Sequence, residues 1–496
     1  MTKQQRLVLV VSILASFVAF LDGAIVNVAL PAIQHELGGG LAAQQWVVDA
    51  YLLTLGSFIL IAGSLSDLLG RKRILTLGLL GFGVASLLCA VAPSSGLLIF
   101  FRGLQGVAGA LLVPSSLAII ISTFSGSAQG KAVGTWTAWT GISFLIGPLL
   151  GGLLVDSVGW RWIFAVNVLP IAVTLYLLRS VKAGQQTQKA KVDFIGAFLC
   201  ALGLGGAVYA LIEQPHYGWS SPLIYATLAV GLVSLIAFLI YENKAAKPML
   251  PLGLFLNHNF SVGNVATLGI YAGLSIATFL IVLFLQQVSG YSALTAGLAL
   301  LPVTLIMFVL SPRFGALAGK HGPRYFMGFG PILAAAGFLL MLRMTPHAHY
   351  FTQLFPAVLL FGIGLSITVA PLTAAILGDV PQAQAGIASA VNNAIARIAG
   401  LLAIAAVGAV VAIQFGNSLQ HTLAGRVPDN VLQKAKQTSL VTTPPAPYRH
   451  DAAFKRAMTD ASVSAYRTGI IVTAGLVISG GIVSLIGIRN GEKAKR

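Results

Sequence analysis

The sequence predicts an all-α polytopic membrane protein, and three observations support this fold class. Apolar residues make up 57% of the 496 residues and charged residues only 9%, whereas an ordinary soluble domain carries about 25% charged residues. Stretches of about 18 or more residues with few charges recur along the whole chain, as a bilayer-spanning helix requires. The 55 glycines agree with this interpretation, because small residues let membrane helices pack closely.

Hydropathy predicts fourteen membrane-spanning helices. The first follows a short basic start with Lys3 and Arg6, and it is too long for the apolar core of a signal peptide. The range 162–179 is short for a span, and the range 387–413 contains two asparagines and an arginine. The ranges are 7–30, 46–66, 74–92, 97–122, 132–155, 162–179, 194–213, 221–241, 262–285, 293–318, 325–342, 352–377, 387–413 and 467–488.

Lysine and arginine gather in the segments that share one side of the membrane with the N-terminus. The short loops on the opposite side hold only Arg161 and Arg343. This bias predicts that both termini are cytoplasmic and that the number of spans is even, and it accounts for the formal net charge of +17 without a nucleic-acid partner. The loop of about 415–466 is also basic and would be external, a departure that long loops often show.

A loop motif after the second predicted helix is repeated after the tenth. The stretch Gly63–Lys72 aligns without a gap with Gly315–Arg324 and shares with it two glycines and a leucine. Repeated halves are a feature of transporters. The expected domains are a six-helix bundle (1–180), two inserted helices with flanking linkers (181–258) and a second six-helix bundle (259–496), whose external loop of about 415–466 would be flexible around a short amphipathic helix near Asp451–Met458.

Ionisable side chains inside a membrane are costly, so each is a candidate functional residue. Asp22, Asp49 and Arg102 share a depth, roughly 22 Å from the cytoplasmic end of the first helix at about 1.5 Å per residue. A carboxylate that loses and regains an arginine partner would release and bind a proton. These three residues are therefore candidates for proton coupling. A permanent structural ion pair is the alternative, and Asp49 could instead be solvated at the interface.

Several polar or aromatic side chains within predicted helices are candidates for a substrate cavity. Gln105 shares a helix face with Arg102, and Asn393 shares one with Arg397. For the second pair, a cavity lining and a structural hydrogen bond between helices are equally compatible with the pattern. The full set of cavity candidates is Asn27, Gln105, Trp136, Trp139, Tyr271, Gln286, Asn392, Asn393 and Arg397.

Two glycine-containing motifs are candidates for conformational gating. In the fifth helix a proline removes a backbone hydrogen bond among glycines that permit bending and close packing, so the motif favours either a moving element or a tight contact. In the repeated loop, Asp67 at a helix end could pair with Arg71 and lock one state, although positive charge that sets topology is the alternative. The gating candidates are Gly63, Asp67, Gly70, Arg71, Gly147, Pro148, Gly151 and Gly152.

The sequence indicates no catalytic residues, no metal site and no cofactor other than a proton gradient. His347 and His349 form a single pair, which is too little for a metal site, and the chain lacks a Walker loop for ATP. Cys89 and Cys200 lie inside apolar segments, so a disulfide framework is not indicated.

With these residues placed, the chain resembles the major facilitator superfamily, and within it the fourteen-spanner branch of drug:proton antiporters, over nearly its whole length. Gly63–Arg73 is similar to the superfamily's loop motif, and Arg102-Gly-Leu-Gln-Gly to its helix 4 motif, whose arginine is associated with proton transfer. Gly147-Pro-Leu-Leu-Gly-Gly is similar to the helix 5 motif of antiporters. The resemblance implies the major facilitator fold, with two six-helix bundles plus two inserted helices.

Three further stretches resemble the same branch, and two positions depart from its pattern. Similar stretches are Leu21–Ile33, Trp160–Asn167 and Leu285–Ser292. In the first, Ala24 stands where the branch usually has threonine, and in the repeated loop Gly319 stands at the position of Asp67. The second departure puts a cytoplasmic latch in the second half of the chain in doubt.

The function that this resemblance implies is a proton-coupled antiporter that exports small amphipathic drugs or toxic organic compounds by alternating access. Expected partners are a small-molecule substrate, protons and the lipid bilayer, with no nucleic acid; we expect a monomer in the cell inner (plasma) membrane. The alternatives are an exporter of a lipid, siderophore or sugar, an uptake symporter of the same fold, and a membrane sensor or intramembrane enzyme. The sequence leaves substrate identity and proton stoichiometry open.

Overall fold

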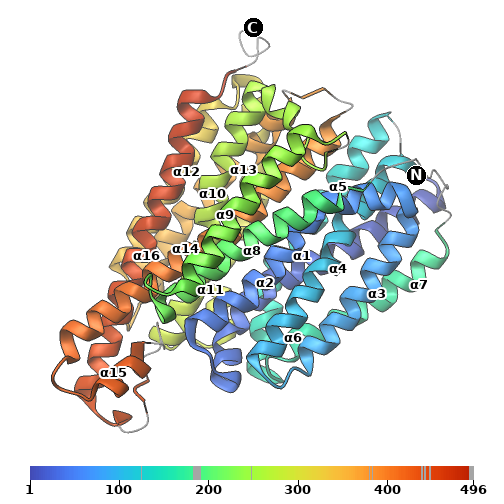
Figure 1. Cartoon of the computed structure of the whole chain (residues 1–496). Helices are drawn as coiled ribbons and strands as arrows, with labels where there is room; N and C mark the ends of the chain where they lie inside the picture. The colour runs from blue at the N-terminus through green and yellow to red at the C-terminus, as the bar shows by residue number, and fades with distance from the viewer. Residues whose placement is uncertain are drawn as a thin grey trace. The chain divides into compact units, whose positions relative to one another are not determined.

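The computed structural model is all-helical, as the sequence predicts. It describes residues 1–124, 126–181, 192–246, 248–378, 380–381, 384–436, 440, 443–445 and 448–490. Within these residues every regular element is a helix (Figure 1). Thirteen helices of the described chain are long and apolar enough to cross a membrane. This is one fewer than the fourteen that hydropathy predicts. The remaining predicted span falls on α5 (Gly126–Ser157), of which Ile146–Ser157 is a shorter apolar helix.

The chain divides into two compact units. Unit 1 comprises Met1–Gly38, Trp46–Gly206 and Ala229–Pro251, and unit 2 comprises Gly39–Gln45, Ala207–Leu228 and Leu252–Arg496. The helices α2 (Gly40–Leu69), α8 (Phe194–Tyr217) and α9 (Pro222–Lys244) therefore contribute residues to both units.

Most of unit 1 is built from helices that follow one another directly in sequence. The first of them begins with a reciprocal cap, in which the Thr2 hydroxyl accepts from the Gln5 amide and the Gln5 side chain accepts from the Thr2 amide. In addition to α2 and α5, they are α1 (Lys3–Leu37), α3 (Arg71–Ala90), α4 (Ser95–Thr123), α6 (Trp162–Ala165) and α7 (Val168–Arg179).

The predicted span over 162–179 is confirmed as Trp162–Arg179, and within it the helix is divided in two. The segment forms the short α6 and then α7, and Val166 and Asn167 lie between them. Both residues keep helical dihedral angles, but their amides bond to carbonyls only two to four residues back, as in a tightened turn. Hydropathy does not register this break because the apolar composition continues through it. The consequence is that Asn167 sits at a helix junction within the membrane segment.

Unit 2 contains longer helices, several of them joined by a single turn of another helix type. The α-helices are α10 (His258–Leu283), α11 (Ala293–His321), α12 (Arg324–Leu340), α13 (Phe355–Gly378), α14 (Ala385–Leu423), α15 (Asp429–Lys436) and α16 (Ala452–Gly487). The short turns are η1 (Leu252–Leu256), η2 (Phe284–Val288), η3 (Met341–Arg343) and η4 (Tyr350–Leu354).

The region of about 415–466 is more helical than its loop-like composition suggests. α14 continues to Leu423 and α16 already begins at Ala452, so the predicted loop boundaries are too wide on both sides. With 39 and 36 residues, these helices are roughly 58 and 54 Å long at about 1.5 Å per residue, well beyond a hydrocarbon core of about 30 Å. Between them α15 is tied to α14, because Lys436 Nζ donates to Gln420 Oε1 at 2.6 Å.

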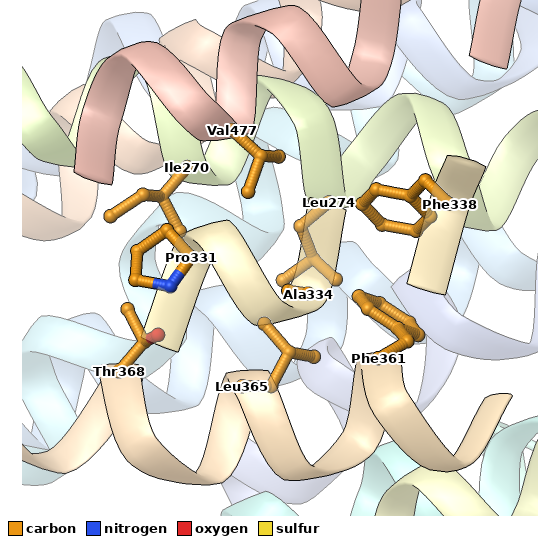
Figure 2. A pocket seen from close by; sticks show the side chains of 9 residues that line it. All are labelled: Ile270, Leu274, Pro331, Ala334, Phe338, Phe361, Leu365, Thr368 and Val477. Carbon is orange, nitrogen blue, oxygen red and sulfur yellow. The ribbon is translucent and has the colours of Figure 1, made fainter. Parts of the chain in front are cut away.

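Small residues bring α12, α13 and α16 of unit 2 into close contact. A Cβ on Gly337 would lie 2.7 Å from the carbonyl oxygen of Ala357, and one on Gly481 would lie 2.8 Å from that of Gly328. Figure 2 shows the side chains that line a small hollow beside this contact, which is too narrow to hold a water molecule. Its lining is apolar apart from Thr368, whose hydroxyl donates to the backbone of its own helix. The hollow is therefore a packing seam and a poor site for a polar ligand.

Each of the two repeated loops contains a glycine with a positive φ. Gly70 separates α2 from α3 with a φ of +94°, and Gly322 separates α11 from α12 with a φ of +86°. Residues with a side chain rarely adopt such positive φ values. The sequence alignment of Gly70 with Gly322 thus corresponds to equivalent turns in the two units.

A basic residue two positions after each of these glycines donates to backbone carbonyl groups near the end of another helix in its unit. In unit 1, Lys72 Nζ donates to the carbonyl oxygens of Arg179 (3.1 Å) and Val181 (2.7 Å), at the end of α7. In unit 2, Arg324 Nε donates to the carbonyl oxygen of Leu485 (2.6 Å), near the end of α16. Cations are favourable at helix C-termini, where carbonyl groups lack intrahelical partners.

Candidate functional site

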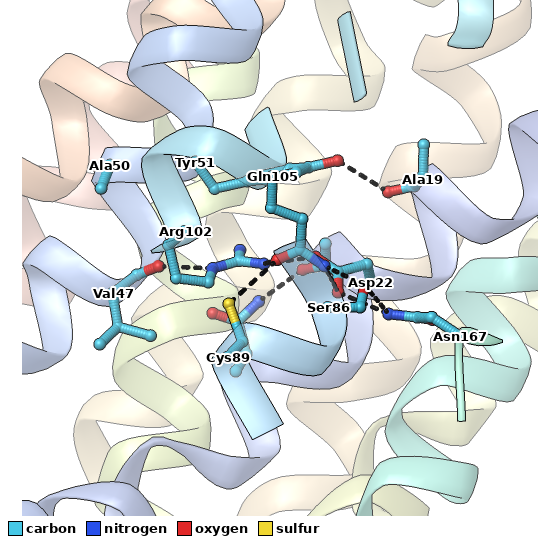
Figure 3. A network of polar contacts seen from close by, with 12 residues as sticks. Ala19, Asp22, Val47, Ala50, Tyr51, Ser86, Cys89, Arg102, Gln105 and Asn167 are labelled. Atoms are coloured by element: carbon cyan, nitrogen blue, oxygen red, sulfur yellow. Dashed lines mark hydrogen bonds and ion pairs between the residues drawn. The ribbon is translucent and has the colours of Figure 1, made fainter. Parts of the chain in front are cut away.

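A buried ion pair lies at the centre of a polar network in unit 1 (Figure 3). Asp22 on α1 is 0% exposed and Arg102 on α4 is 1% exposed, and Arg102 Nη1 lies 2.5 Å from Asp22 Oδ2. Removing two charges from water is costly, and the cost is offset only where the geometry is good and the remaining polar atoms are satisfied. The surroundings of the pair therefore decide whether it is stable.

The Asp22 carboxylate accepts three hydrogen bonds. Besides the bond from Arg102, its Oδ1 accepts from Gln105 Nε2 and from Asn167 Nδ2, both at 2.9 Å. Gln105 also accepts from Arg102 Nη1 at 2.7 Å, which closes a ring of hydrogen bonds around the ion pair. The charged form of the carboxylate is thus well solvated by protein groups.

The Arg102 guanidinium is held from two further sides. Its Nε donates to the carbonyl oxygen of Val47 on α2 at 2.9 Å. Its central carbon lies 4.3 Å from the ring centroid of Tyr51 and 5.8 Å from that of Phe164, distances at which an aromatic face attracts a cation. The Tyr51 hydroxyl in turn donates to the carbonyl oxygen of Ala19 at 3.1 Å. A movement of Arg102 would therefore disturb α1, α2 and α4 together.

Residues on α3 and at the α6–α7 junction complete the network. Ser86 Oγ accepts from Gln105 Nε2 at 2.8 Å and from Asn167 Nδ2 at 3.5 Å. Sequence reasoning did not assign a role to either Ser86 or Asn167. For Asn167 a signal existed, because it ends the family-like stretch from Trp160 to Asn167. For Ser86 the sequence offers no signal, since hydropathy does not distinguish a lone serine in an apolar helix.

Asp49 lies outside this network, although the sequence places it at a similar depth. It is 0% exposed in α2, and neither carboxylate oxygen has a hydrogen-bond partner among the residues that the structure describes. The interpretation that it is solvated at the interface is therefore wrong, because α2 buries it. A buried carboxylate without a partner is costly unless it is neutral. Instead of Asp49, the backbone of Val47 provides the contact of α2 with Arg102.

The helix 5 motif forms the contact between α5 and the helix that carries Asp22. A Cβ on Gly147 would lie 2.6 Å from Ala24 Cβ, and one on Gly151 would lie 2.7 Å from Ile25 Cγ1. Gly152 is buried as well, and Pro148 lies inside the α5 helix. The interpretation of this motif as a tight contact therefore applies, at a surface that begins two residues from the carboxylate along α1, and its interpretation as a bend stays a prediction.

The two tryptophans of α5 have different environments. Trp136 is 9% exposed and its Nε1 donates to Ser16 Oγ on α1 at 3.1 Å, whereas Trp139 is 51% exposed. Asn27 is partly buried, and its amide donates to the Gly23 carbonyl oxygen of its own helix at 3.4 Å. Of the cavity candidates in unit 1, the structure brings Gln105 into contact with the ion pair and Trp136 into a neighbouring contact between helices.

The adjacent asparagines of α14 in unit 2 also have different environments. Asn392 Nδ2 donates to Asn264 Oδ1 and to Thr267 Oγ1 on α10, both at 3.0 Å. Asn393 is exposed, and it donates to the Ser389 carbonyl oxygen of its own helix at 3.0 Å. The sequence left two interpretations open, a cavity lining and a structural hydrogen bond between helices. For Asn392 the structure shows the second.

Three other candidates of unit 2 are partly buried. Tyr271 on α10 lies near enough to Arg397 on α14 to interact with it electrostatically. Gln286 lies in the turn η2 that continues α10. Tyr271 and Arg397 follow the contact made by Asn392 along α10 and α14, so the structure brings these two candidates to the same pair of helices.

The gating candidates of the repeated loop are placed only in part. A Cβ on Gly63 would meet nothing within 4 Å, and Gly70 provides the positive-φ turn described above. Arg71 begins α3 and is partly buried. The side chain of Asp67 lies outside the described residues, so its pairing with Arg71 stays a prediction.

Curated relatives match most of the chain. It is 36% identical over 412 residues to the puromycin resistance protein pur8 of Streptomyces alboniger, covering 81% of each chain. It is 34% identical over 438 residues to the multidrug resistance protein Stp of Mycobacterium tuberculosis, covering 87% of this chain and 80% of the relative. It is 32% identical over 431 residues to the multidrug transporter protein MdtP of Bacillus subtilis, covering 85% of this chain and 78% of the relative.

Solved transporters share the fold at low identity. A bacterial homologue of the human lysosomal transporter Spinster, in an inward-facing and unoccupied conformation, matches 99% of this chain and 100% of its own with a TM-score of 0.66 and 16% identity. A D-xylose–proton symporter matches 98% of both chains with a TM-score of 0.63 and 14% identity. The family model of the Major Facilitator Superfamily matches residues 12–404. The chain therefore belongs to the Major Facilitator Superfamily, and it is a multi-pass membrane transporter of small molecules rather than an enzyme.

Proposed function

We propose that the protein is a proton-coupled antiporter that exports small amphipathic, toxic organic compounds by alternating access. Relatives named for resistance to puromycin and to multiple drugs support export of such compounds. The observation that carries the proton coupling is the buried Asp22–Arg102 pair, in which the Asp22 carboxylate accepts hydrogen bonds from three side chains. In this proposal the protein lies in the plasma membrane with both termini in the cytoplasm, as the bias of basic residues favours.

The ion pair links protonation to rearrangement by simple electrostatics. Leaving one charge of a buried pair without its partner costs about 3–5 kcal/mol. A proton on Asp22 therefore leaves the Arg102 cation without its counter-charge, while the Val47 carbonyl and the aromatic rings remain as weaker partners. Arg102 is then stabilised by any conformation that offers it water or another acceptor. Because Arg102 contacts α1, α2 and α4, a change of partner favours helix movement.

The proposed cycle uses this link in both directions. A proton from outside reaches Asp22, weakens the ion pair and biases the protein toward the inward-facing state. Substrate then loads, the proton leaves to the cytoplasm, and the restored pair favours reorientation. Substrate and proton can shift this equilibrium only through different affinities for the two states. Asp49, which is buried without a described partner, is the candidate for a second proton.

The test uses purified protein in liposomes with an imposed pH gradient, acidic on the face equivalent to the outside. Lumenal pH is followed while lipophilic cations and neutral drugs are added. We expect substrate-triggered proton flux in the wild type, its loss in Asp22→Asn, and partial retention in Asp22→Glu, which keeps a titratable group. Val10→Ala is the control on the same helix, because Val10 is 45% exposed and takes no part in the polar network around Asp22.

Two results would contradict the proposal. Full substrate-triggered flux in Asp22→Asn would remove Asp22 from the proton path. Folded wild-type protein that gives no proton flux with any compound would favour a carrier of lipid or sugar, or a carrier not coupled to protons. Asp49→Asn, measured in the same way, separates one proton site from two, because loss of flux in that variant alone would place the coupling at Asp49.

A further inference from the structure

A groove between α3 and α7 opens on the surface of unit 1, at the end where α3 begins. Its volume is about 200 Å³. Three of its residues come from each helix: Lys72, Thr76 and Leu80 from α3, and Leu175, Leu178 and Arg179 from α7. The groove takes no part in the polar network around Asp22, so the transport mechanism proposed above leaves it without a role.

The lining of this groove is basic at one end and apolar along its length. Lys72 already donates to two backbone carbonyl oxygens, and its ammonium group has three donors, so one N–H remains. Arg179 is exposed at the last turn of α7. Leu80 is 49% exposed, and together with Leu175 and Leu178 it continues the groove away from the charges. A matching ligand has an anionic head and an apolar tail.

The dimensions of the groove fit one leaflet of a bilayer. Lys72 and Leu80 are eight residues apart on α3, which is roughly 12 Å at about 1.5 Å per residue. Half of a hydrocarbon core of about 30 Å is about 15 Å. The surrounding faces of these helices expose apolar side chains, with Leu77 at 49% and Tyr176 at 72%. Basic residues therefore stand at headgroup depth while the leucines stand at acyl-chain depth.

We propose that this groove binds an anionic phospholipid of the phosphatidylglycerol type, with its phosphate at Lys72 and Arg179 and an acyl chain along Leu80, Leu175 and Leu178. The assignment to the cytoplasmic leaflet rests on the orientation given under the proposed function; the binding itself does not. Juxtamembrane basic residues attract anionic lipids, and basic pockets between helices bind their headgroups. A free phosphate ion would leave the apolar length of the groove unused. The bound lipid would bridge the start of α3 and the end of α7, which Lys72 already joins.

The experiment is native mass spectrometry of the full-length protein in detergent, titrated with phosphatidylglycerol or phosphatidylethanolamine of the same acyl chains. We expect phosphatidylglycerol adducts to form at lower lipid concentration than phosphatidylethanolamine adducts. Arg179→Gln should weaken phosphatidylglycerol binding about fivefold, which corresponds to about 1 kcal/mol for one basic residue at a membrane surface. The control is Arg73→Gln, because Arg73 is an exposed neighbour of the groove that does not line it.

A second pair of variants tests the apolar part of the groove. Leu80→Trp should fill it and weaken binding several-fold with both basic residues in place, whereas Leu77→Trp, on the same helix and equally exposed, should not. Equal binding of the two lipids would overturn the proposal, as would equal losses in Arg179→Gln and Arg73→Gln or unchanged binding in Leu80→Trp. Unfolding temperatures equal to that of the wild type keep these outcomes separate from misfolding, and none of them depends on transport.

Discussion

The two units share a loop architecture but differ in the chemistry of their buried polar contacts. Each unit has a positive-φ glycine followed by a basic residue that donates to backbone carbonyl groups near the end of another helix. The residue is Lys72 in unit 1, at the end of α7, and Arg324 in unit 2, near the end of α16. Inside unit 1, however, α1 and α4 are joined by the charged pair Asp22–Arg102. Inside unit 2, the hydrogen bonds described between α10 and α14 are made by neutral groups, with Asn392 donating to Asn264 and Thr267, and the cation Arg397 lies near Tyr271 on the same two helices.

This difference separates a part that can respond to protons from a part that supports the fold. A carboxylate changes its charge when it binds a proton, and inside a protein that change alters every nearby interaction. An amide–hydroxyl contact keeps the same charge at every physiological pH. Both units therefore contain the positive-φ glycine and the basic residue after it, while the titratable centre that we propose for coupling lies in unit 1.

Removal of the carboxylate should have the largest effect on stability. Asp22→Ala leaves Arg102 buried without its partner, and we expect the free energy of unfolding to fall by about 3–5 kcal/mol. The double variant Asp22→Ala/Arg102→Met should recover much of this loss, because neither charge then remains buried. Denaturant unfolding in detergent micelles measures both. A single variant as stable as the wild type would show that the pair is not tightly coupled to the fold.

Crowding the contact between α1 and α5 should have the next largest effect. Gly147→Ala places a methyl group 2.6 Å from Ala24 Cβ, and overpacking of this kind typically costs about 1–3 kcal/mol. Gly134→Ala on the same helix meets nothing within 4 Å and is the control. We expect it to be neutral or slightly stabilising, because alanine favours helix more than glycine. Thermal unfolding of the two variants makes the comparison, and equal melting temperatures would argue against a tight contact.

Removal of the neutral contact in unit 2 should lower stability by a smaller amount and leave proton coupling unchanged. Asn392→Ala removes two hydrogen bonds to α10, and at about 1 kcal/mol for a typical bond the loss should be roughly 1–2 kcal/mol. Proton-coupled flux per folded molecule should stay near the wild-type value. Asn393→Ala, at an exposed position, should change neither quantity. Abolished coupling in Asn392→Ala would extend the proton machinery into unit 2.

An exposed ion pair of unit 1 should have the smallest effect. Glu36 accepts from Arg161 and, at 2.6 Å, from Trp160 Nε1, and the two charged side chains are 48% and 36% exposed. Arg161→Gln should lower stability by less than about 1 kcal/mol, because water screens such pairs. The effect should shrink further in high salt. A loss as large as that of Asp22→Ala would mean that burial is not what distinguishes the Asp22–Arg102 pair.

Parts of the candidate site could be predicted from local sequence, and parts could not. A charge in an apolar helix stands out by composition, so Asp22 and Arg102 are recognisable from the sequence alone. Ser86 and Asn167 do not stand out, because their significance arises from helices that meet only in the fold. Trp136 and Trp139 look alike in sequence, and their spacing of three residues places them on one face of the helix. One is nevertheless buried against Ser16 and the other is exposed, a difference that only the packing of α1 against α5 decides.

By itself the sequence determined the fold class, most of the spans, the repeated loop and the candidate charges Asp22, Asp49 and Arg102, because hydropathy and charge are properties of short segments. Only the tertiary structure decided the partners of that pair. Arg102 and Asn167 lie 80 and 145 residues from Asp22 along the chain, and both bond to Asp22 rather than to Asp49. The physical reason is that a buried polar atom must find its hydrogen bonds within about 3 Å in space. Helix packing alone sets which distant residues come that close.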